Sequence, residues 1–332
     1  MNIDKRLKVL TTLGDFLLSE SLLMEGAIHK AYLFNPWFTP DNIKKSLHAI
    51  VLQMLSIEKL ENWIANYQIA TPETPKNIAI ISAGNIPLVN FHDILCVFIT
   101  GHHVQVKLSE KDQYLLPAII QALTDIEPSF KKEIQIVERI TGQDAVIATG
   151  SNNTGRYFEY YFGKKPHIIR KNRNSMAVLS GDETEQALQS LGHDIFDYFG
   201  LGCRNVSLLF CPKDYDLSKL KQPWAEWNQL LEHHKYKSNL DYQRTVYLMN
   251  SIPMEDFDFA NIVHNAHLAS PISCLHIHRY EHEQEIVDFI EQQAQHLQCV
   301  VSENSIPFGK SQEPHLADYA DNVDVIDFLL KL

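Results

Sequence analysis

One cysteine in this chain has neighbours suited to covalent chemistry. Cys203 lies in the stretch GLGCRN, residues 200–205. The two glycines leave the backbone free to bend and to let a substrate approach closely, and the adjacent arginine favours the thiolate over the thiol. Because a thiolate attacks a carbonyl carbon, Cys203 is predicted to be a covalent nucleophile. The alternative is a buried small hydrophobe, which is our interpretation for the cysteines in apolar surroundings, Cys96, Cys211, Cys274 and Cys299.

The segment SAGN, residues 82–85, follows a predicted strand and precedes an apolar helix. In an open α/β sheet, ligands bind at this end of a strand. The side-chain amide of Asn85 could donate to the oxyanion that forms when a nucleophile attacks a carbonyl. Asparagine also caps helices, so on this segment alone a catalytic role and a capping role for Asn85 both remain open.

A second strand end carries residues suited to a nucleotide. Lys107 ends a predicted strand, and a lysine there can reach a ribose or a phosphate. Glu110 could bind ribose hydroxyls, which would disfavour a 2′-phosphate. The alternative is a solvated lysine followed by Ser109 at the start of a helix.

Gly150 and Ser151 open the stretch GSNNTG at a strand-to-helix turn. The first amides of the following helix favour a pyrophosphate. The stretch lacks the G-x-G-x-x-G fingerprint, and glycine with serine at such a turn can also serve simply to cap the helix.

The bulk properties exclude several classes of protein. The 332 residues, 45% hydrophobic and 21% charged, suffice for two globular domains. A net charge of −12 without a long basic run argues against nucleic-acid binding. We find no apolar run long enough for a membrane span and no signal peptide. The five scattered cysteines indicate the reducing cytoplasm, and the sixteen histidines lack metal-ligand spacing, so no metal site is expected.

Hydrophobic periodicity predicts helices first and a parallel sheet afterwards. Residues 4–67 have apolar residues at helical spacing, and TPETP at 71–75 is a linker. Strands and helices then alternate, as in a mostly parallel sheet with helices on both faces. The pattern weakens after residue 214. The predicted strands are 78–81, 104–107, 134–137, 145–148, 167–169, 175–179 and 206–210, and the predicted helices are 88–100, 114–123, 154–162 and 183–199.

Two clusters receive structural interpretations. Aromatic residues over 157–162 and 224–227 could line an acyl tunnel, but packing in a core is the interpretation we favour. The basic cluster RKNR at 170–173 could meet the phosphates of a carrier group, but a solvated turn is favoured.

In their order along the chain, these segments resemble the aldehyde dehydrogenase superfamily. GNIP at 84–87 is similar to its oxyanion-asparagine motif, VKLSE at 106–110 to its adenosine-ribose segment, TGS at 149–151 to its phosphate turn, and Gly202-Cys203 to its nucleophile. The closer resemblance is to the acyl-CoA reductase branch that includes the fatty acid reductase of bacterial luminescence (LuxC-like). This resemblance rests on sequence segments such as SAGNIPLVNFHDILCVFITGHHVQVKLSEKD, FGLGCRNVS and FGKSQEPHLADYADNVDVIDFLL.

One departure from ordinary aldehyde dehydrogenases is informative. Those enzymes carry a glutamate general base in a Glu-Leu-Gly-Gly motif between the phosphate turn and the cysteine. The corresponding stretch here, RKNRNSM at 170–176, has no glutamate. Without that base, water is poorly activated to hydrolyse a thioester intermediate, which favours an acyl group that arrives as a thioester.

The resemblance implies an aldehyde dehydrogenase-like α/β fold and its division into domains. Residues 1–72 would be a helical N-terminal segment, 73–172 a Rossmann-type dinucleotide-binding domain, and 173–304 an α/β catalytic domain carrying Cys203. Residues 305–332 would return to the cofactor domain or to a dimer interface. Lys107, Ser109, Glu110, Gly150 and Ser151 would bind the cofactor.

The function implied is NAD(P)H-dependent reduction of an acyl-CoA or acyl-carrier thioester to an aldehyde through an acyl-Cys203 intermediate, with Asn85 holding the oxyanion. The resemblance favours NADPH, whereas Glu110 favours NADH. An acyltransferase partner and a homo-oligomer are possible by the same resemblance. Two alternatives stay open: a catalytically silent dinucleotide-binding scaffold or acyltransferase partner, and an aldehyde-oxidising dehydrogenase. The sequence leaves the acyl chain length and the role of residues 225–271 undetermined.

Overall fold

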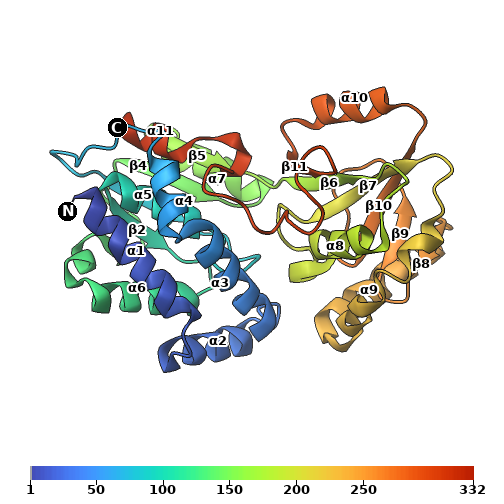
Figure 1. The fold of residues 1–332 in the computed structure, drawn as a ribbon, viewed down its shortest axis with the longest axis horizontal. Helices are drawn as coiled ribbons and strands as arrows, with labels where there is room; N and C mark the ends of the chain where they lie inside the picture. The colour runs from blue at the N-terminus through green and yellow to red at the C-terminus, as the bar shows by residue number, and fades with distance from the viewer. Residues whose placement is uncertain (1) are drawn as a thin grey trace. The chain divides into compact units, whose positions relative to one another are not determined.

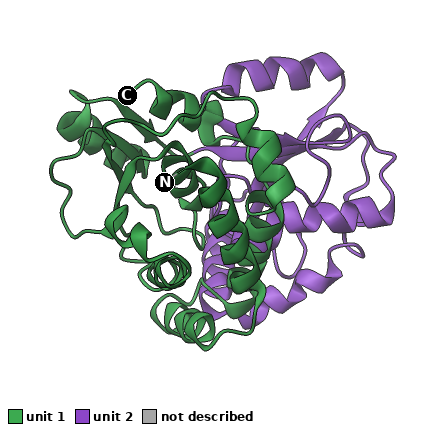
Figure 2. Cartoon of the chain, turned by 60° about the vertical axis from the view of Figure 1, so that its left-hand side comes forward, with its two compact units in different colours: residues 1–172, 313–332 green, residues 173–312 purple. Residues whose placement is uncertain are grey.

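The computed structural model describes residues 2–332, and the chain divides into two compact units (Figures 1 and 2). Unit 1 contains the chain up to Asn172 together with Glu313–Leu332, and unit 2 is Arg173–Gln312. Each unit is built around its own sheet, and all strand pairs are parallel except one at the edge of the second sheet. The expected α/β class with a helical N-terminus is confirmed.

The sheet of unit 1 has the strand order β3-β2-β1-β4-β5. The chain runs outward from β1 to β3 and then resumes on the other side of β1 with β4, so the order reverses between β1 and β4. Ligands of open α/β sheets bind beyond the carboxyl ends of the strands at such a reversal. The elements are β1 (Asn77–Ile81), α5 (Phe91–Thr100), β2 (His103–Lys107), α6 (Leu115–Ile126), η1 (Pro128–Lys132), β3 (Ile134–Ile136), β4 (Ala145–Thr149), α7 (Asn152–Phe162) and β5 (His167–Arg170).

The central strands of this sheet are continuous apolar runs because both of their faces are covered. Ile78, Ala79 and Ile80 of β1 are completely buried, and so are the first four residues of β4, 145–148. This is why the sequence pattern located these strands to within a residue or two.

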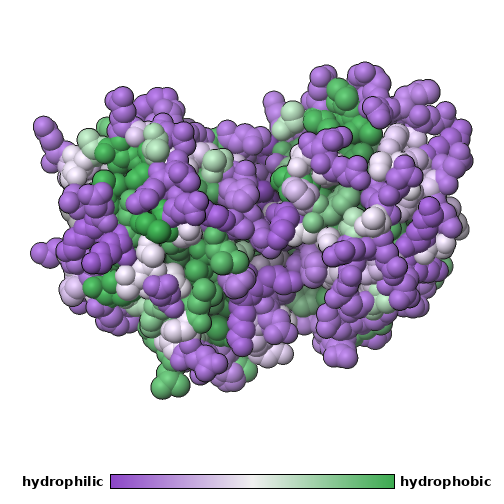
Figure 3. Space-filling model, in the orientation of Figure 1, coloured by the Kyte–Doolittle hydropathy of each residue, from purple (hydrophilic) through white to green (hydrophobic). Residues whose placement is uncertain are grey.

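Four helices precede the first sheet and share its core. They are α1 (Ile3–Leu18), α2 (Leu22–Phe34), α3 (Pro40–Met54) and α4 (Ile57–Ile64). Side chains cap two of them, since Asn2 accepts from the N–H of Lys5 and Thr39 from the N–H of Asn42. Their buried residues belong to the same hydrophobic cluster as the residues of β1, so the helical segment is part of unit 1. Three apolar residues of α2, Leu22, Leu33 and Phe34, are exposed. Figure 3 shows hydrophobic side chains at the surface among hydrophilic ones.

The chain returns to unit 1 at Glu313 and closes its core. This segment contains η5 (Ala320–Asn322) and α11 (Val325–Leu330). The Trp63 indole N–H donates to the hydroxyl of Tyr319 over 2.9 Å, and the Tyr67 hydroxyl donates to Asp324 over 2.7 Å. Asp324 also caps α11 by accepting from the N–H of Asp327.

Unit 2 has a six-stranded sheet of order β11-β6-β7-β10-β9-β8, in which β8 pairs antiparallel with β9. Its elements are β6 (Asn174–Val178), α8 (Glu185–Phe196), η2 (Asp197–Gly200), β7 (Val206–Pro212), η3 (Leu217–Leu220), η4 (Ala225–Glu232), α9 (His234–Met249), β8 (Met254–Asp256), β9 (Asn261–His264), β10 (Cys274–Tyr280), α10 (Glu283–Gln293) and β11 (Leu297–Val301). Within residues 2–332, no helix is long and apolar enough to cross a membrane.

Candidate active site

The loop after β1 holds Asn85 away from any capping position. The helix that follows, α5, begins at Phe91 with Asn90 before it. Asn85 lies several residues earlier, and its side chain is exposed. The structure therefore excludes Asn85 as the cap of α5, and an exposed amide beyond the carboxyl end of a strand remains.

The same loop is pressed against the segment that follows β2. A Cβ atom added to Gly84 would lie only 2.5 Å from Oγ of Ser109 and 2.9 Å from Cβ of Lys111. The N–H of Ser82 also donates to the carbonyl of Lys107 over 3.0 Å. Glycine at position 84 is thus required for the close approach of two segments, and it brings the loop of Asn85 against Ser109.

The segment after β2 presents charged side chains to solvent. Lys107 is the last residue of β2; it is exposed, and its Nζ donates to the carbonyl of Glu138 over 3.1 Å. Glu110 is also exposed. Because α6 begins only at Leu115, Ser109 does not start a helix, which removes the alternative that the sequence left open for it.

The turn between β4 and α7 joins Gly150 to the neighbouring strand. The N–H of Gly150 donates to the carbonyl of Arg170 over 3.1 Å. Ser151 caps α7 by accepting from the N–H of Thr154 over 3.2 Å. A Cβ atom on Gly155 would lie 3.1 Å from the Lys171 side chain, so this glycine lets the helix pack closely on the end of β5. The helix start has the electrostatic character that favours an anion.

A buried polar network ties these turns together beneath the edge of the sheet. Asp93 in the first turn of α5 accepts from Arg170 at the end of β5 over 2.6 Å, and both side chains are about 95% buried. The Asn90 amide donates to Asp93 over 3.1 Å and to the hydroxyl of Thr149 over 3.3 Å, while its oxygen accepts from the N–H of Ala83 over 3.1 Å. The network therefore links the Asn85 loop to the ends of β4 and β5.

Charge pairing sets the ionisation of this network. Burial alone would raise the pKa of Asp93, but the Arg170 guanidinium lowers that pKa below its usual value. The solvated turn predicted for 170–173 is wrong at Arg170, which is 4% exposed. The sequence signal for this network is modest: Asn90 and Asp93 are polar residues three apart at the start of a very apolar helix.

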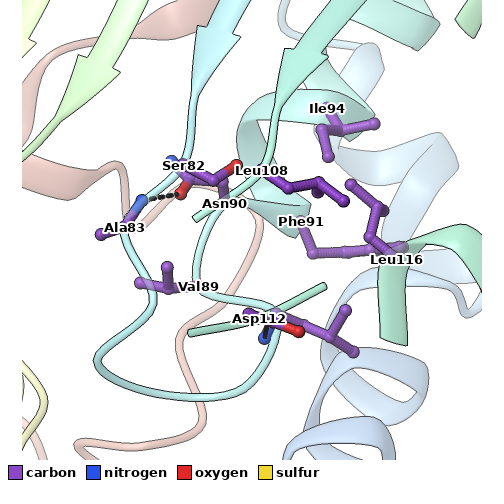
Figure 4. A pocket seen from close by; sticks show the side chains of 10 residues that line it. Ser82, Ala83, Val89, Asn90, Phe91, Ile94, Leu108, Asp112 and Leu116 are labelled. Carbon is purple, nitrogen blue, oxygen red and sulfur yellow. Dashed lines mark hydrogen bonds between the residues drawn. The ribbon is translucent and has the colours of Figure 1, made fainter. Parts of the chain in front are cut away.

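A small pocket opens beside the same loop (Figure 4). Its lining includes Ser82, Asn90, Leu108, Asp112 and Leu116. One carboxylate oxygen of Asp112 accepts from the N–H of Leu88 over 3.0 Å, and the other has no hydrogen-bond partner among residues 2–332. Burial raises the pKa of Asp112 to about 6.

We expect Asp112→Asn to stabilise the protein at pH 7. The folded pKa of about 6 lies above the ordinary value of 3.8, so the folded state binds more protons between these values and stability falls as pH rises through them. Removing the buried charge should raise the free energy of unfolding at pH 7 by up to about 3 kcal/mol. Urea unfolding at about pH 4 and pH 7 measures the free energy of unfolding of the variant and the wild type. Asp125→Asn, at an exposed position, is the control. An unchanged pH dependence in Asp112→Asn would contradict it.

In unit 2, Cys203 lies in a turn that is pinned from two sides. The Asn205 side chain accepts from the N–H of Gly202 and donates to the carbonyl of Asp197, each over 2.7 Å. The hydroxyl of Ser175 donates to the carbonyl of Cys203 over 3.0 Å. The cysteine itself is partly exposed. The backbone of this partly exposed cysteine is therefore held in place.

The chain before this turn has an unusual backbone. Tyr198 and Phe199 have φ of 53° and 60°, followed by Gly200 at 73°. Consecutive left-handed non-glycine residues are costly. Both aromatic side chains are buried, and the ring centroid of Phe199 lies 4.3 Å from that of His233. This packing stabilises the left-handed backbone of the two residues.

Burial separates the five cysteines into two groups. Cys96, Cys211 and Cys274 are buried, and burial raises the pKa of each thiol, to about 11 for Cys211. Cys203 and Cys299 are partly exposed. The buried interpretation is therefore wrong for Cys299.

The aromatic clusters also differ from the expectation in part. Trp224 and Trp227 are core residues of unit 2, as predicted. The core prediction is wrong for three residues of α7, Tyr157, Tyr160 and Tyr161, which are 66–80% exposed. On β10, Nδ1 of His276 lies 2.7 Å from the carbonyl oxygen of His267. No group of three or more potential metal ligands occurs in residues 2–332.

The structure thus distributes the predicted site residues over both units. Asn85, the β2 segment with Lys107, Ser109 and Glu110, and the turn with Gly150 and Ser151 all follow the carboxyl ends of parallel strands in one sheet, so they share one edge of unit 1. Cys203 belongs to unit 2.

The family model described as acyl-CoA reductase (LuxC) matches residues 17–308. The matched range includes the Asn85 loop, both segments predicted to bind the cofactor, and the Cys203 turn. The chain belongs to the LuxC acyl-CoA reductase family. A search of the curated proteins found no match.

Solved structures with the same fold are aldehyde dehydrogenases. Aldehyde dehydrogenase 21 from Physcomitrella patens, in complex with the reaction product succinate, has a TM-score of 0.68 at 11% identity and covers 91% of this chain and 73% of its own. An indole-3-acetaldehyde dehydrogenase mutant from P. syringae, in complex with NAD+ and IAA, has a TM-score of 0.63 at 15% identity, with 91% and 72% covered. A Mycobacterium tuberculosis aldehyde dehydrogenase complexed with NAD+ has a TM-score of 0.64 at 12% identity, and the match covers 91% of this chain and 73% of that enzyme. This acyl-CoA reductase family member therefore has the aldehyde dehydrogenase fold that the sequence predicted.

Proposed function

We propose that the chain reduces an acyl thioester to an aldehyde with a nicotinamide dinucleotide, through a covalent acyl-Cys203 intermediate. The observation that carries the proposal is the Cys203 turn. In a member of the LuxC family, this turn holds a partly exposed cysteine on a backbone fixed by Ser175 and Asn205. Three of the other cysteines are buried, which favours Cys203 as the nucleophile.

The acyl transfer follows from the roles of this chain's residues. The Cys203 thiolate attacks the carbonyl carbon of the acyl thioester, forming a C–S bond and a tetrahedral oxyanion. The exposed amide of Asn85 donates to that oxyanion. Collapse of the intermediate breaks the original C–S bond, so the carrier leaves as a thiolate and the acyl group stays on Cys203. Loss of the aldehyde later regenerates the Cys203 thiolate.

Several residues of unit 1 suit a dinucleotide. The α7 start with Gly150 and Ser151 would hold the pyrophosphate. Lys107, Ser109 and Glu110 would hold the ribose, and the exposed side chains of Lys107 and Glu110 fit that role. When bound, the cofactor supplies the hydride that reduces the acyl group. NAD+ complexes of structural neighbours support a nicotinamide dinucleotide. The family resemblance favours NADPH, whereas Glu110 favours NADH.

The stretch after β5 explains why the acyl group would not be lost to water. Arg170 is occupied by its buried ion pair with Asp93. No carboxylate lies within residues 170–176, so this stretch supplies no general base to activate a water molecule. Poor activation of water by this stretch favours reduction of the acyl-enzyme over its hydrolysis. We place the reaction in a reducing cytoplasm, where the thiol stays reduced.

The experiment mixes the purified full chain with a long-chain acyl-CoA and follows oxidation of NADPH and of NADH by absorbance. We expect oxidation that requires the acyl donor, and the faster nucleotide identifies the cofactor. A folded, nucleotide-binding protein that oxidises neither cofactor with any acyl-CoA or acyl-carrier donor, with or without an acyltransferase, would establish a silent scaffold instead. Reduction of NAD+ by an aldehyde without CoA, in the absence of the reductive reaction, would establish an oxidising dehydrogenase.

We expect Asn85→Ala to lower kcat for acyl-CoA reduction by about 10²–10³-fold with little change in KM, because an oxyanion donor acts in the transition state. The exposed Asn62→Ala on α4 is the matched control and should leave both constants unchanged. Steady-state kinetics with saturating cofactor measures the effect on kcat separately from the effect on KM. An unchanged kcat in Asn85→Ala would remove this residue from the oxyanion site.

A further inference from the structure

One hydroxyl group in unit 2 contacts both partly exposed cysteines. Ser175, the second residue of β6, is completely buried. Its Oγ lies 3.0 Å from the carbonyl oxygen of Cys203 and 3.0 Å from Sγ of Cys299. The Cys203 backbone and the Cys299 sulfur are therefore at most about 6 Å apart, although the two residues are far apart in the sequence.

A strand irregularity turns Cys299 out of the core at this point. Leu297 pairs with Asn174 and Val300 with Met176, so Gln298 and Cys299 both face the single residue Ser175. This is a β-bulge, which re-aims side chains and is common beside active sites. Gln298 is buried and Cys299 is partly exposed. The register between β6 and β7 also shifts immediately after Ser175.

We propose that Cys203 and Cys299 form a reversible disulfide when the protein meets a peroxide, with Cys299 as the resolving thiol. This inference rests on the thiolate character of Cys203 in the proposed function. The Cys203 thiolate attacks a peroxide oxygen and breaks the O–O bond, giving a sulfenic acid and releasing water or an alcohol after protonation. The Cys299 thiol then attacks the sulfenic sulfur, and the S–S bond forms as water leaves.

The pair accounts for how the nucleophile could survive oxidation. A sulfenic acid without a nearby thiol proceeds to sulfinic and sulfonic acids, which simple thiols do not reverse. Closing the disulfide needs sulfur atoms about 2 Å apart, so Cys299 Sγ must exchange its contact with the Ser175 hydroxyl for a bond to Sγ of Cys203. In the reduced protein the Cys203 turn is held by side-chain hydrogen bonds with Ser175 and Asn205, and a shift of this turn breaks those bonds but no strand pairing. The three buried thiols are protected by their burial.

The experiment exposes the reduced full chain to limiting hydrogen peroxide, alkylates free thiols and maps peptides by mass spectrometry without reduction. We expect a Cys203–Cys299 cross-linked peptide and the loss of two thiols per chain, both restored by dithiothreitol. In Cys299→Ser and Cys299→Ala, we expect unchanged reductase activity before treatment and about tenfold less activity recovered by dithiothreitol afterwards, with sulfinic acid at Cys203. Cys211→Ala is the control and should recover like the wild type.

The mass readout does not depend on catalysis, so the two proposals can fail separately. A cross-link in a protein without reductase activity would uphold the disulfide and overturn the proposed function. An active wild-type reductase whose Cys203 overoxidises as fast as in the Cys299 variants, or that pairs Cys203 with another cysteine or a second chain, would overturn the disulfide.

Discussion

Cys203→Ala is expected to lower kcat/KM for acyl-CoA reduction by at least about a thousandfold, because removing a nucleophile abolishes the covalent route and leaves only binding and orientation. Cofactor binding should persist, since the predicted cofactor residues belong to unit 1 and Cys203 to unit 2. Nucleotide affinity and the rate of acyl-CoA-dependent oxidation, measured on the same preparation, separate these effects.

Cys299→Ala is the matched control, because it removes the other partly exposed cysteine of the same unit. It should keep its activity in reducing buffer. Alkylation at neutral pH gives an independent readout: Cys203 should be modified much faster than Cys96, Cys211 or Cys274, whose pKa values are raised by burial. A Cys203→Ala protein as active as the wild type would exclude the covalent mechanism.

The sequence predicted the first sheet well for a physical reason. Strands covered on both faces are short apolar runs between turns, and β1 and β4 are of this kind. The helix predicted from residue 88 begins instead at Phe91. Leu88 has a φ of 57°, and Asn90 is engaged in holding the preceding loop. Both features depend on tertiary contacts, so hydrophobic periodicity could not predict the start of α5.

The second unit was harder to predict because its middle part lacks a single period. Residues 217–232 contain two 3₁₀ helices, η3 and η4, and β8 has only three residues. The tryptophans of this region are buried around them, so the aromatic content indicated a core without indicating its elements.

The sequence indicated which residues of the site could do chemistry, but it did not indicate the burial or the contacts of their side chains. The chemistry-bearing residues Asn85, Lys107 and Cys203 could be chosen from their motifs, and all three are accessible. Arg170 could not be distinguished from a solvated arginine, because its burial depends on Asp93, which is 77 residues away in the sequence. The partial exposure of Cys299 depends likewise on its surroundings in the fold, because it lies on the edge strand β11 at the bulge opposite Ser175.

Arg170→Met is expected to destabilise the protein by about 3–5 kcal/mol, because it leaves the Asp93 carboxylate buried without its partner. The ion pair is 2.6 Å long and about 95% buried on both sides. The Arg170 charge also lowers the pKa of Asp93, so the variant should shift that pKa upward and make the protein bind a proton on folding. Urea unfolding at neutral pH measures the loss as a lower midpoint.

The neighbouring Lys171→Met is the matched control. Lys171 pairs with Glu159 over 2.8 Å, but both side chains are about half exposed, and such surface pairs contribute about 0–1 kcal/mol. The double variant Arg170→Met with Asp93→Leu removes both charges and should recover most of the stability. Among residues 2–332, Nε and Nη2 of Arg170 have no hydrogen-bond partner, so replacing the pair should lose no other hydrogen bond of these two nitrogens. If Arg170→Met and Lys171→Met unfolded at the same urea concentration, the buried network would not be what holds the Asn85 loop and the Gly150 turn at one edge of the sheet.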